Sequence, residues 1–263
     1  MPSVGAMEAM TRIGFAARGI MYVLIGYLAL KSGRAKNEEA ALHFLNDGSW
    51  KWLLAAMALG FLGYGIWRLS EAIVDTEGHG SSAKGRAVRA GGAVSGLVHL
   101  GLAFTAVKLA WGKDGHGSSE GARESAASTL SLPGGELIMA LAAAALITTG
   151  LYQLVKAIRA GFLRHLDGRA ARQPWIVWMG RLGYAARGVI FLIIGWFCWK
   201  SASSDDASEA GGLREALASL PDMLQLAAAV GLLLFGLFSL VEARFRRIND
   251  PRVLERLKAA VPG

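Results

Sequence analysis

The chain has 263 residues, 53% of them hydrophobic, and a mean hydropathy of +0.38. Both values are high for a soluble domain, so they favour an integral membrane protein; a soluble bundle of buried helices is the alternative. A net charge of +8 could indicate nucleic-acid binding, but the charges are segregated along the chain in the way that membrane topology requires.

The first predicted unit covers residues 10–75 and contains two apolar runs. Gly19–Leu30 is only 12 residues long, so it spans a membrane only if Arg18 lies inside the helix, near an interface that its long side chain can reach. Leu53–Trp67 is flanked by tryptophans, which suit the membrane interfaces. Between the two runs, the leucine spacing in Glu39–Leu45 predicts a short helix on the outer surface.

The second predicted unit covers residues 87–160. Its runs Ala90–Val107 and Leu137–Val155 are free of charge and are 18 and 19 residues long. Each is long enough to cross about 30 Å of hydrocarbon as a helix.

The third predicted unit covers residues 179–245. Gly188–Trp199 resembles the first run and again needs an arginine, Arg187, inside the span, whereas Met223–Val241 is a full span of 19 residues. Leu213–Leu220 predicts a second short surface helix. Residues 249–263 are predicted to form a cytoplasmic tail. The single cysteine, Cys198, excludes an internal disulfide and a thiolate metal cage.

The three units are internal repeats. The segment Arg12–Ser32 shares 10 of 21 residues with Arg181–Ser201, and the middle copy retains Arg89, Gly91 and Gly96. The second helices also align, and three segments share a glycine at the first position and an alanine at the last: Gly65–Ala72, Gly150–Ala157 and Gly236–Ala243. Repeats that each contain an even number of helices keep the same orientation, so an axis along the membrane normal relates them.

The motif A-R-x-G-x-x-A-R-G, an aromatic residue and a further glycine, with a paired second helix in three copies, resembles a bacterial membrane family catalogued as domain of unknown function 1206. The resemblance covers roughly residues 10–245. It implies an integral membrane protein of about six helices and no established activity. The second copy departs from the pattern because Ser95 stands where the pattern has arginine.

The predicted fold is all-α, with six transmembrane helices formed by three parallel two-helix repeats in an approximate pseudo-threefold arrangement. The segments on one side of these spans carry a net charge of +11, and those on the other side carry −3. Positive residues favour the cytoplasm, so we expect both termini to be cytoplasmic in a bacterial cytoplasmic (inner) membrane. The basic side is expected to face anionic lipid headgroups.

Two arginines and two glutamates near the cytoplasmic boundary are predicted to form structural ion pairs. We expect Arg18 to pair with Glu71 and Arg187 with Glu242, within one repeat or between repeats. In the second copy Ser95 replaces the arginine and Lys156 replaces the glutamate; the joint loss of both charges is what an ion pair would produce. Ion or anion coordination and headgroup binding are the alternatives.

Other polar residues lie within the predicted spans. His99 is near the middle of its span, where a neutral imidazole bonded to a neighbouring helix and a proton relay are both open interpretations. Arg68, Gln153 and Ser239 occupy equivalent positions near the cytoplasmic helix ends. They could ring a vestibule or complete the helix ends at headgroup level.

Three functional classes are compatible with this pattern. The favoured one is a structural or accessory subunit that packs against other membrane proteins or lipids, as part of a larger complex or a homo-oligomer. The second is a channel or transporter for a small ion or solute that uses His99, Arg18 and Arg187. An enzyme is not expected, because no catalytic or nucleotide-binding motif is recognisable. No metal or cofactor is predicted.

Overall fold

The structure is a computed structural model that describes residues 4–33, 35–36, 38–46, 51–75, 78–111 and 118–245. Within these residues all regular elements are helical, as the all-α prediction requires. The long helices are α1 (Val4–Ser32), α3 (Lys51–Val74), α4 (Ala83–Ala110), α6 (Gly135–Arg159), α8 (Pro174–Ser204) and α10 (Asp222–Phe245). The shorter ones are α2 (Glu38–Asn46), α5 (Ser118–Leu130), η1 (Gly161–His165), α7 (Gly168–Ala171), η2 (Ala207–Glu209) and α9 (Leu213–Ala218). The predicted tail at 249–263 lies outside the described residues.

The six long helices are apolar and long enough to cross a membrane, in agreement with the predicted number of spans. The two short apolar runs become full spans because their helices continue through the arginines: Arg18 lies within α1 and Arg187 within α8. Pro174 opens α8 at a position where its missing N–H is tolerated.

Each long helix packs most extensively against a helix of another repeat. The dominant pairs are α1 with α10, α4 with α3, and α8 with α6. The first helix of each repeat therefore lies against the second helix of the repeat before it, and the first repeat lies against the third.

The same glycine positions make all three pairs close. Gly19 faces Gly236, Gly96 faces Gly65, and Gly188 faces Gly150. A Cβ atom added to Gly96 would lie 3.0 Å from the Gly65 carbonyl oxygen, and the corresponding distance from Gly188 to Gly150 is also 3.0 Å. At Gly19 it would lie 2.9 Å from the Gly236 oxygen. Only glycine permits backbones to approach this closely. Such close packing favours the association of helices in lipid.

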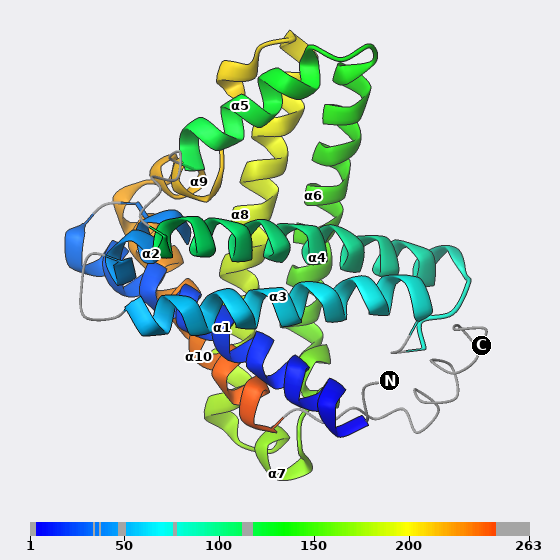
Figure 1. Ribbon diagram of the computed structural model, residues 1–263, viewed down its shortest axis with the longest axis vertical. Helices are drawn as coiled ribbons and strands as arrows, with labels where there is room; N and C mark the ends of the chain where they lie inside the picture. Colours follow the sequence, from blue (N-terminus) through cyan, green and yellow to red (C-terminus); the bar gives the residue numbers. More distant parts are fainter. Residues whose placement is uncertain are drawn as a thin grey trace.

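The three pairs are joined into a series rather than a closed ring. Contacts between α1 and α3 and between α8 and α10 give the order α4, α3, α1, α10, α8, α6, and among the described residues α4 and α6 make at most a marginal contact. Figure 1 shows α3 and α4 lying crosswise to α6 and α8, with α1 and α10 running diagonally. The two helices of the second repeat are thus at opposite ends of the series, and the packing does not establish the expected pseudo-threefold ring.

The short helices α2 and α9 are part of the core. Leu42 on α2 and Leu217 on α9 are fully buried, and they belong to one apolar cluster with Ile25, Phe61 and Leu232. Both predicted short helices are present, with one face buried and exposed residues such as Phe44 and Arg214 on the other. Their position at the outer surface of the membrane stays a prediction.

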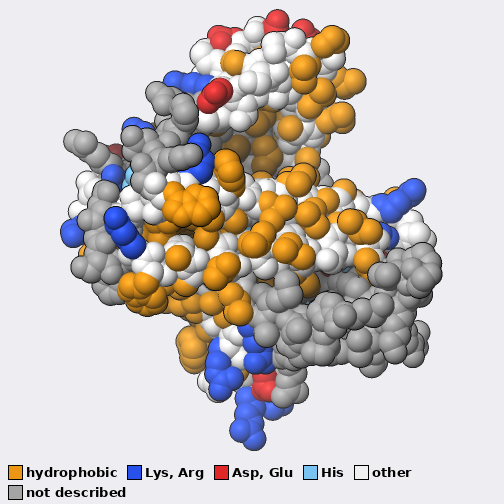
Figure 2. Space-filling view, viewed as in Figure 1, with side chains coloured by type: hydrophobic (Ala, Val, Ile, Leu, Met, Phe, Trp, Pro, Cys, Tyr) orange, Lys and Arg blue, Asp and Glu red, His pale blue; other side chains and the backbone are white. Residues whose placement is uncertain are grey.

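Acidic and basic side chains are unevenly distributed over the molecule. Figure 2 shows Lys and Arg side chains at the end where Figure 1 places α7, and Asp and Glu side chains at the end where α5 lies. Exposed residues of the basic end include Arg164, Arg169 and Arg172, and those of the acidic end include Glu124 and Asp205.

Candidate functional site

The polar residues of the spans lie beside the glycine contacts, at equivalent positions in the three helix pairs. We name each set by the residue that precedes the glycine of the first helix. The Arg18 seam contains Arg18, Ser239 and Glu242; the Ser95 seam contains Ser95, Arg68 and Glu71; the Arg187 seam contains Arg187, Gln153 and Lys156.

In the Arg18 seam a buried arginine is bonded through all three of its nitrogens. Arg18 is 6% exposed. Its Nη2 donates to Glu242 Oε2 at 2.7 Å, its Nη1 to the Tyr64 hydroxyl at 3.1 Å, and its Nε to Ser239 Oγ at 3.2 Å. Its guanidinium carbon also lies 4.5 Å from the centre of the Phe15 ring. Removing either charge would leave the other buried without compensation, so we expect this ion pair to have a structural role.

The observed partner of Arg18 differs from the expected one. We expected Arg18 to pair with Glu71 and Arg187 with Glu242, but the carboxylate bonded to Arg18 is Glu242, on α10 of the third repeat. The reason is the packing: α1 lies most extensively against α10, while α3 lies most extensively against α4.

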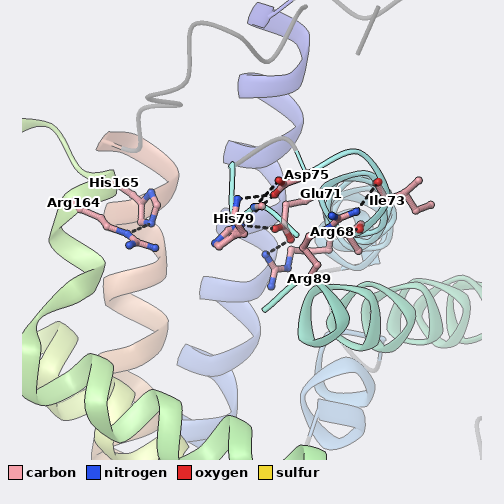
Figure 3. A network of polar contacts seen from close by, with 10 residues as sticks. Arg68, Glu71, Ile73, Asp75, His79, Arg89, Arg164 and His165 are labelled. Atoms are coloured by element: carbon pink, nitrogen blue, oxygen red, sulfur yellow. Dashed lines mark hydrogen bonds and ion pairs between the residues drawn. The ribbon is translucent and has the colours of Figure 1, made fainter. Parts of the chain in front are cut away.

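In the Ser95 seam, Glu71 contacts an arginine of its own helix and a histidine of the following turn. Glu71 is fully buried. Its Oε2 accepts from Arg68 Nη1 at 3.1 Å, and its Oε1 lies 3.2 Å from His79 Nδ1. Gly92 leaves the space for this carboxylate, since a Cβ atom there would lie 2.6 Å from Oε2. Figure 3 shows Arg68 and His79 converging on Glu71.

The turn after α3 is built around Asp75. Its φ of 57° is left-handed, and its carboxylate accepts from the backbone N–H groups of His79 at 2.6 Å and Gly80 at 2.7 Å. Partial burial opposes ionisation, but these two hydrogen bonds, together with the nearby charges of Arg89 and His79, lower the pKa of Asp75 below its ordinary value. Arg89 completes the turn by donating to the Ala72 and Ile73 carbonyls, both at 2.8 Å.

The Arg187 seam contains no carboxylate. Arg187 Nη1 donates to Gln153 Oε1 at 3.4 Å, a long hydrogen bond. The guanidinium carbon lies 4.8 Å from the Phe191 ring centre, 4.9 Å from that of Phe235 and 5.5 Å from that of Tyr22. Lys156 Nζ lies 4.6 Å from the centre of the Tyr184 ring. The expected pairing of Arg187 with Glu242 is therefore replaced by an amide and aromatic faces.

His99 is a buried core residue. Its Nδ1 lies 2.7 Å from the carbonyl oxygen of Ser95 on its own helix, not on a neighbouring helix as one interpretation held. The imidazole is 6% exposed and its centre lies 4.4 Å from that of Tyr64. These contacts favour the packing interpretation.

Sequence reasoning missed Tyr64 and His79 as partners of the charged residues. Tyr64 had a usable signal, since it immediately precedes the repeated Gly65 and Phe235 precedes Gly236 in the same way. His79 had none, because only the sharp turn at Asp75 brings it back to Glu71. No cluster of three or more His, Cys, Asp or Glu residues suited to a metal ion occurs in the described part of the chain.

Comparison with known proteins places the three repeats in one family. The model of the family described as Domain of Unknown Function (DUF1206) matches residues 13–75, 90–160 and 182–246. The chain is also similar to an uncharacterized protein, YxxB, of Bacillus subtilis (strain 168), with 32% identity over 251 residues that cover 90% of each chain. No solved structure matches it.

Proposed function

The chain belongs to the DUF1206 family, and on that premise we propose that it is a structural or accessory subunit of the bacterial cytoplasmic membrane. In this role the six apolar helices pack against other membrane proteins or against lipid. The proposal assigns no catalytic activity to the chain.

The proposal rests on the hydrogen bonds of Arg18, which are made within the protein. A transport site needs polar groups that can exchange partners with a passing solute. All three nitrogens of Arg18 are instead bonded to Glu242, Tyr64 and Ser239 inside the bundle. Such a fully bonded buried charge holds helices together, which suits a scaffold better than a pathway.

The separation of charge supports an orientation with both termini in the cytoplasm. The basic end around α7 suits the cytoplasmic side, where anionic headgroups attract Lys and Arg. The acidic end around α5 then faces outward.

The matching glycine contacts support an origin of the bundle from three repeats about one axis along the membrane normal. Each repeat contributes one glycine to the seam before it and one to the seam after it. An approximate threefold relation between the repeats would produce this pattern. The lack of an extensive contact between α4 and α6, among the described residues, departs from that symmetry.

A transporter for a small ion is the second candidate function. The Arg187 seam favours it, because in the described part of the chain that arginine donates to the Gln153 amide and makes no ion pair with a carboxylate. His99 would be its other polar group.

The composition of the protein in its native membrane tests the accessory role. We would extract the chain into native lipid nanodiscs and determine the mass and the identity of every copurifying protein. The proposal expects a fixed ratio to one defined membrane partner that survives high salt. A lone chain that conducts ions after reconstitution, with the flux abolished in Arg187→Gln or His99→Ala, would contradict it.

A further inference from the structure

In the first and third repeats, the two long helices of the repeat contact each other. The contacts are α1 with α3 and α8 with α10. A Cβ atom added to Gly14 would lie 2.5 Å from Tyr64 Cβ, and one added to Gly60 would lie 2.5 Å from Ala17 Cβ. The equivalent close contacts of the third repeat are Gly183 with Phe235 and Gly231 with Ala186. The same positions therefore form the same interface twice.

The second repeat has these positions but not the interface. On α4 they are Gly91 and Val94, and on α6 they are Ala145 and Thr149. Among the described residues, an added Cβ atom at Gly91 would meet open space, and Val94 is 54% exposed. Ala145 is exposed as well, and α4 and α6 make at most a marginal contact in the described part of the chain. Each helix thus carries half of an interface that the other half does not cover.

One more pair of positions extends both halves. Met21 on α1 and Ile190 on α8 are each 1% exposed, whereas Val98 at the equivalent position of α4 is 56% exposed. Met57 on α3 is 1% exposed, but its equivalent on α6, Ala142, is exposed. We call Gly91, Val94 and Val98 the α4 face, and Ala142, Ala145 and Thr149 the α6 face. Both are surfaces that the fold buries elsewhere in the same molecule.

The two faces are held apart within one chain. The glycine contacts fix α4 against α3 and α6 against α8. The close packing of α1 with α3 and of α8 with α10 fixes these pairs in turn, and α4 lies crosswise to α6 (Figure 1). Bringing the faces together inside the chain would therefore break close contacts. A second copy of the chain presents both faces without any such change.

We propose that a second copy of this chain covers both faces, with the α4 face of each copy packed against the α6 face of the other. Because each copy offers both halves, one twofold axis along the membrane normal forms the two contacts and closes the assembly as a dimer. Lipid is a poorer occupant, since small residues such as Gly91 and Ala145 favour the close approach of a helix. The interface does not rest on the accessory role proposed above.

Disulfide cross-linking in native membranes tests the interface on full chains in which Cys198→Ala removes the native thiol. One chain carries Val94→Cys, and a coexpressed chain with a different tag carries Ala145→Cys. We expect about tenfold more cross-linked heterodimer than with Val230→Cys in place of Ala145→Cys, because a disulfide needs Cβ atoms about 4 Å apart. Val230 is the matched control: it is 41% exposed and adjoins the position equivalent to Ala145, but it lies on α10, in the middle of the helix series.

Equal yields from the two combinations would overturn the proposal. A disulfide that forms only within a single chain carrying both Val94→Cys and Ala145→Cys would also overturn it, because α4 and α6 would then meet inside the chain.

Two adjacent substitutions on α6 give an independent test. Ala144 and Ala145 are both exposed, so a larger side chain at either position leaves the packing of a single chain unchanged. The equivalents of Ala144 in the other repeats are exposed, whereas those of Ala145 are glycines in close contact. Ala145→Leu should therefore convert the dimer into monomers, and Ala144→Leu should leave it intact, as measured by mass in native lipid nanodiscs. A monomeric wild type, or a dimer that survives Ala145→Leu, would refute the interface.

The same mass measurement separates this interface from the accessory role. A dimer without any other protein would support the interface and contradict the accessory role. A single copy bound to a different membrane protein would do the reverse.

Discussion

Glu242 supplies the negative charge that balances the buried guanidinium of Arg18. Replacing Glu242 should therefore destabilise the protein. Glu242→Gln leaves a buried guanidinium without its counter-charge, so we expect a loss of about 3–5 kcal/mol in the free energy of unfolding. Adding Arg18→Gln should recover a large part of that loss, because the unpaired charge disappears. Chemical unfolding of the purified protein in detergent measures both effects.

An exposed ion pair is the control for that experiment. Lys200 and Glu209 lie 2.7 Å apart, but their side chains are 44% and 40% exposed. Glu209→Gln should therefore cost less than about 1 kcal/mol. An equal loss in the free energy of unfolding for Glu242→Gln and Glu209→Gln would refute a structural role of the Arg18–Glu242 ion pair.

Asp75 makes the turn after α3 sensitive to acid. Its pKa is lower in the folded protein than the ordinary value of 3.8. The ionised carboxylate therefore stabilises the fold above pH 3.8, and this contribution is lost as the pH falls through the lower folded pKa. We expect Asp75→Asn to lower the unfolding midpoint at pH 7 and to differ little from the wild type near pH 2. A midpoint difference that is the same at both pH values would contradict this role.

The second repeat shows what could not be inferred from the sequence at the level of residues. Ser95 and Lys156 looked like the joint loss of one ion pair, yet they lie in different seams, because the extensive helix pairs form between repeats. Glu71 keeps a partner in Arg68, three residues earlier on its own helix. The polar residues could be selected from the repeat pattern, whereas their partners depended on packing that a repeat does not specify.

At the scale of helices, the glycine contacts predict which substitutions separate a pair. Gly96→Ala places a Cβ atom 2.9 Å from Leu69 Cγ and 3.0 Å from the Gly65 carbonyl. We expect α3 and α4 to be forced apart at a cost of about 1–3 kcal/mol. On the same helix, Gly101 has no atom within 4 Å of an added Cβ, so Gly101→Ala should be neutral or stabilise the helix by up to about 1 kcal/mol. Thermal unfolding of the two variants compares them; the reverse order of stability would rule out this contact.

The existence of the long helices could be predicted, but the environment of the short ones could not. Apolar length and the repeated R-G motif sufficed for six spans, because a helix is the structure that satisfies its backbone within lipid. Leucine periodicity also predicted short helices near α2 and α9. It could not tell an inward face from a face on a membrane surface, and Leu42 and Leu217 proved to be fully buried.

At the scale of the whole molecule, the open series of helices has a consequence for the second repeat. Its helix α4 is attached mainly to α3 of the first repeat and α6 mainly to α8 of the third. Within the described ranges, the second repeat is therefore held by its neighbours and not by extensive contacts between its own two helices. A change in the Ser95 seam should act on α4, and a change in the Arg187 seam should act on α6.

The separation of basic and acidic ends predicts the sidedness of the whole molecule. α8 has 31 residues, about 46 Å of helix, so its two ends reach water on opposite sides of a hydrocarbon core of about 30 Å. In a Cys198→Ala background, the variant Ser204→Cys should react with a membrane-impermeant maleimide in intact cells, whereas Arg172→Cys should react only after the membrane is opened. Both positions are exposed in the folded chain, so burial would not explain a failure to react. The opposite pattern would place the termini outside, and reaction of both variants in intact cells would mean that α8 does not cross the membrane.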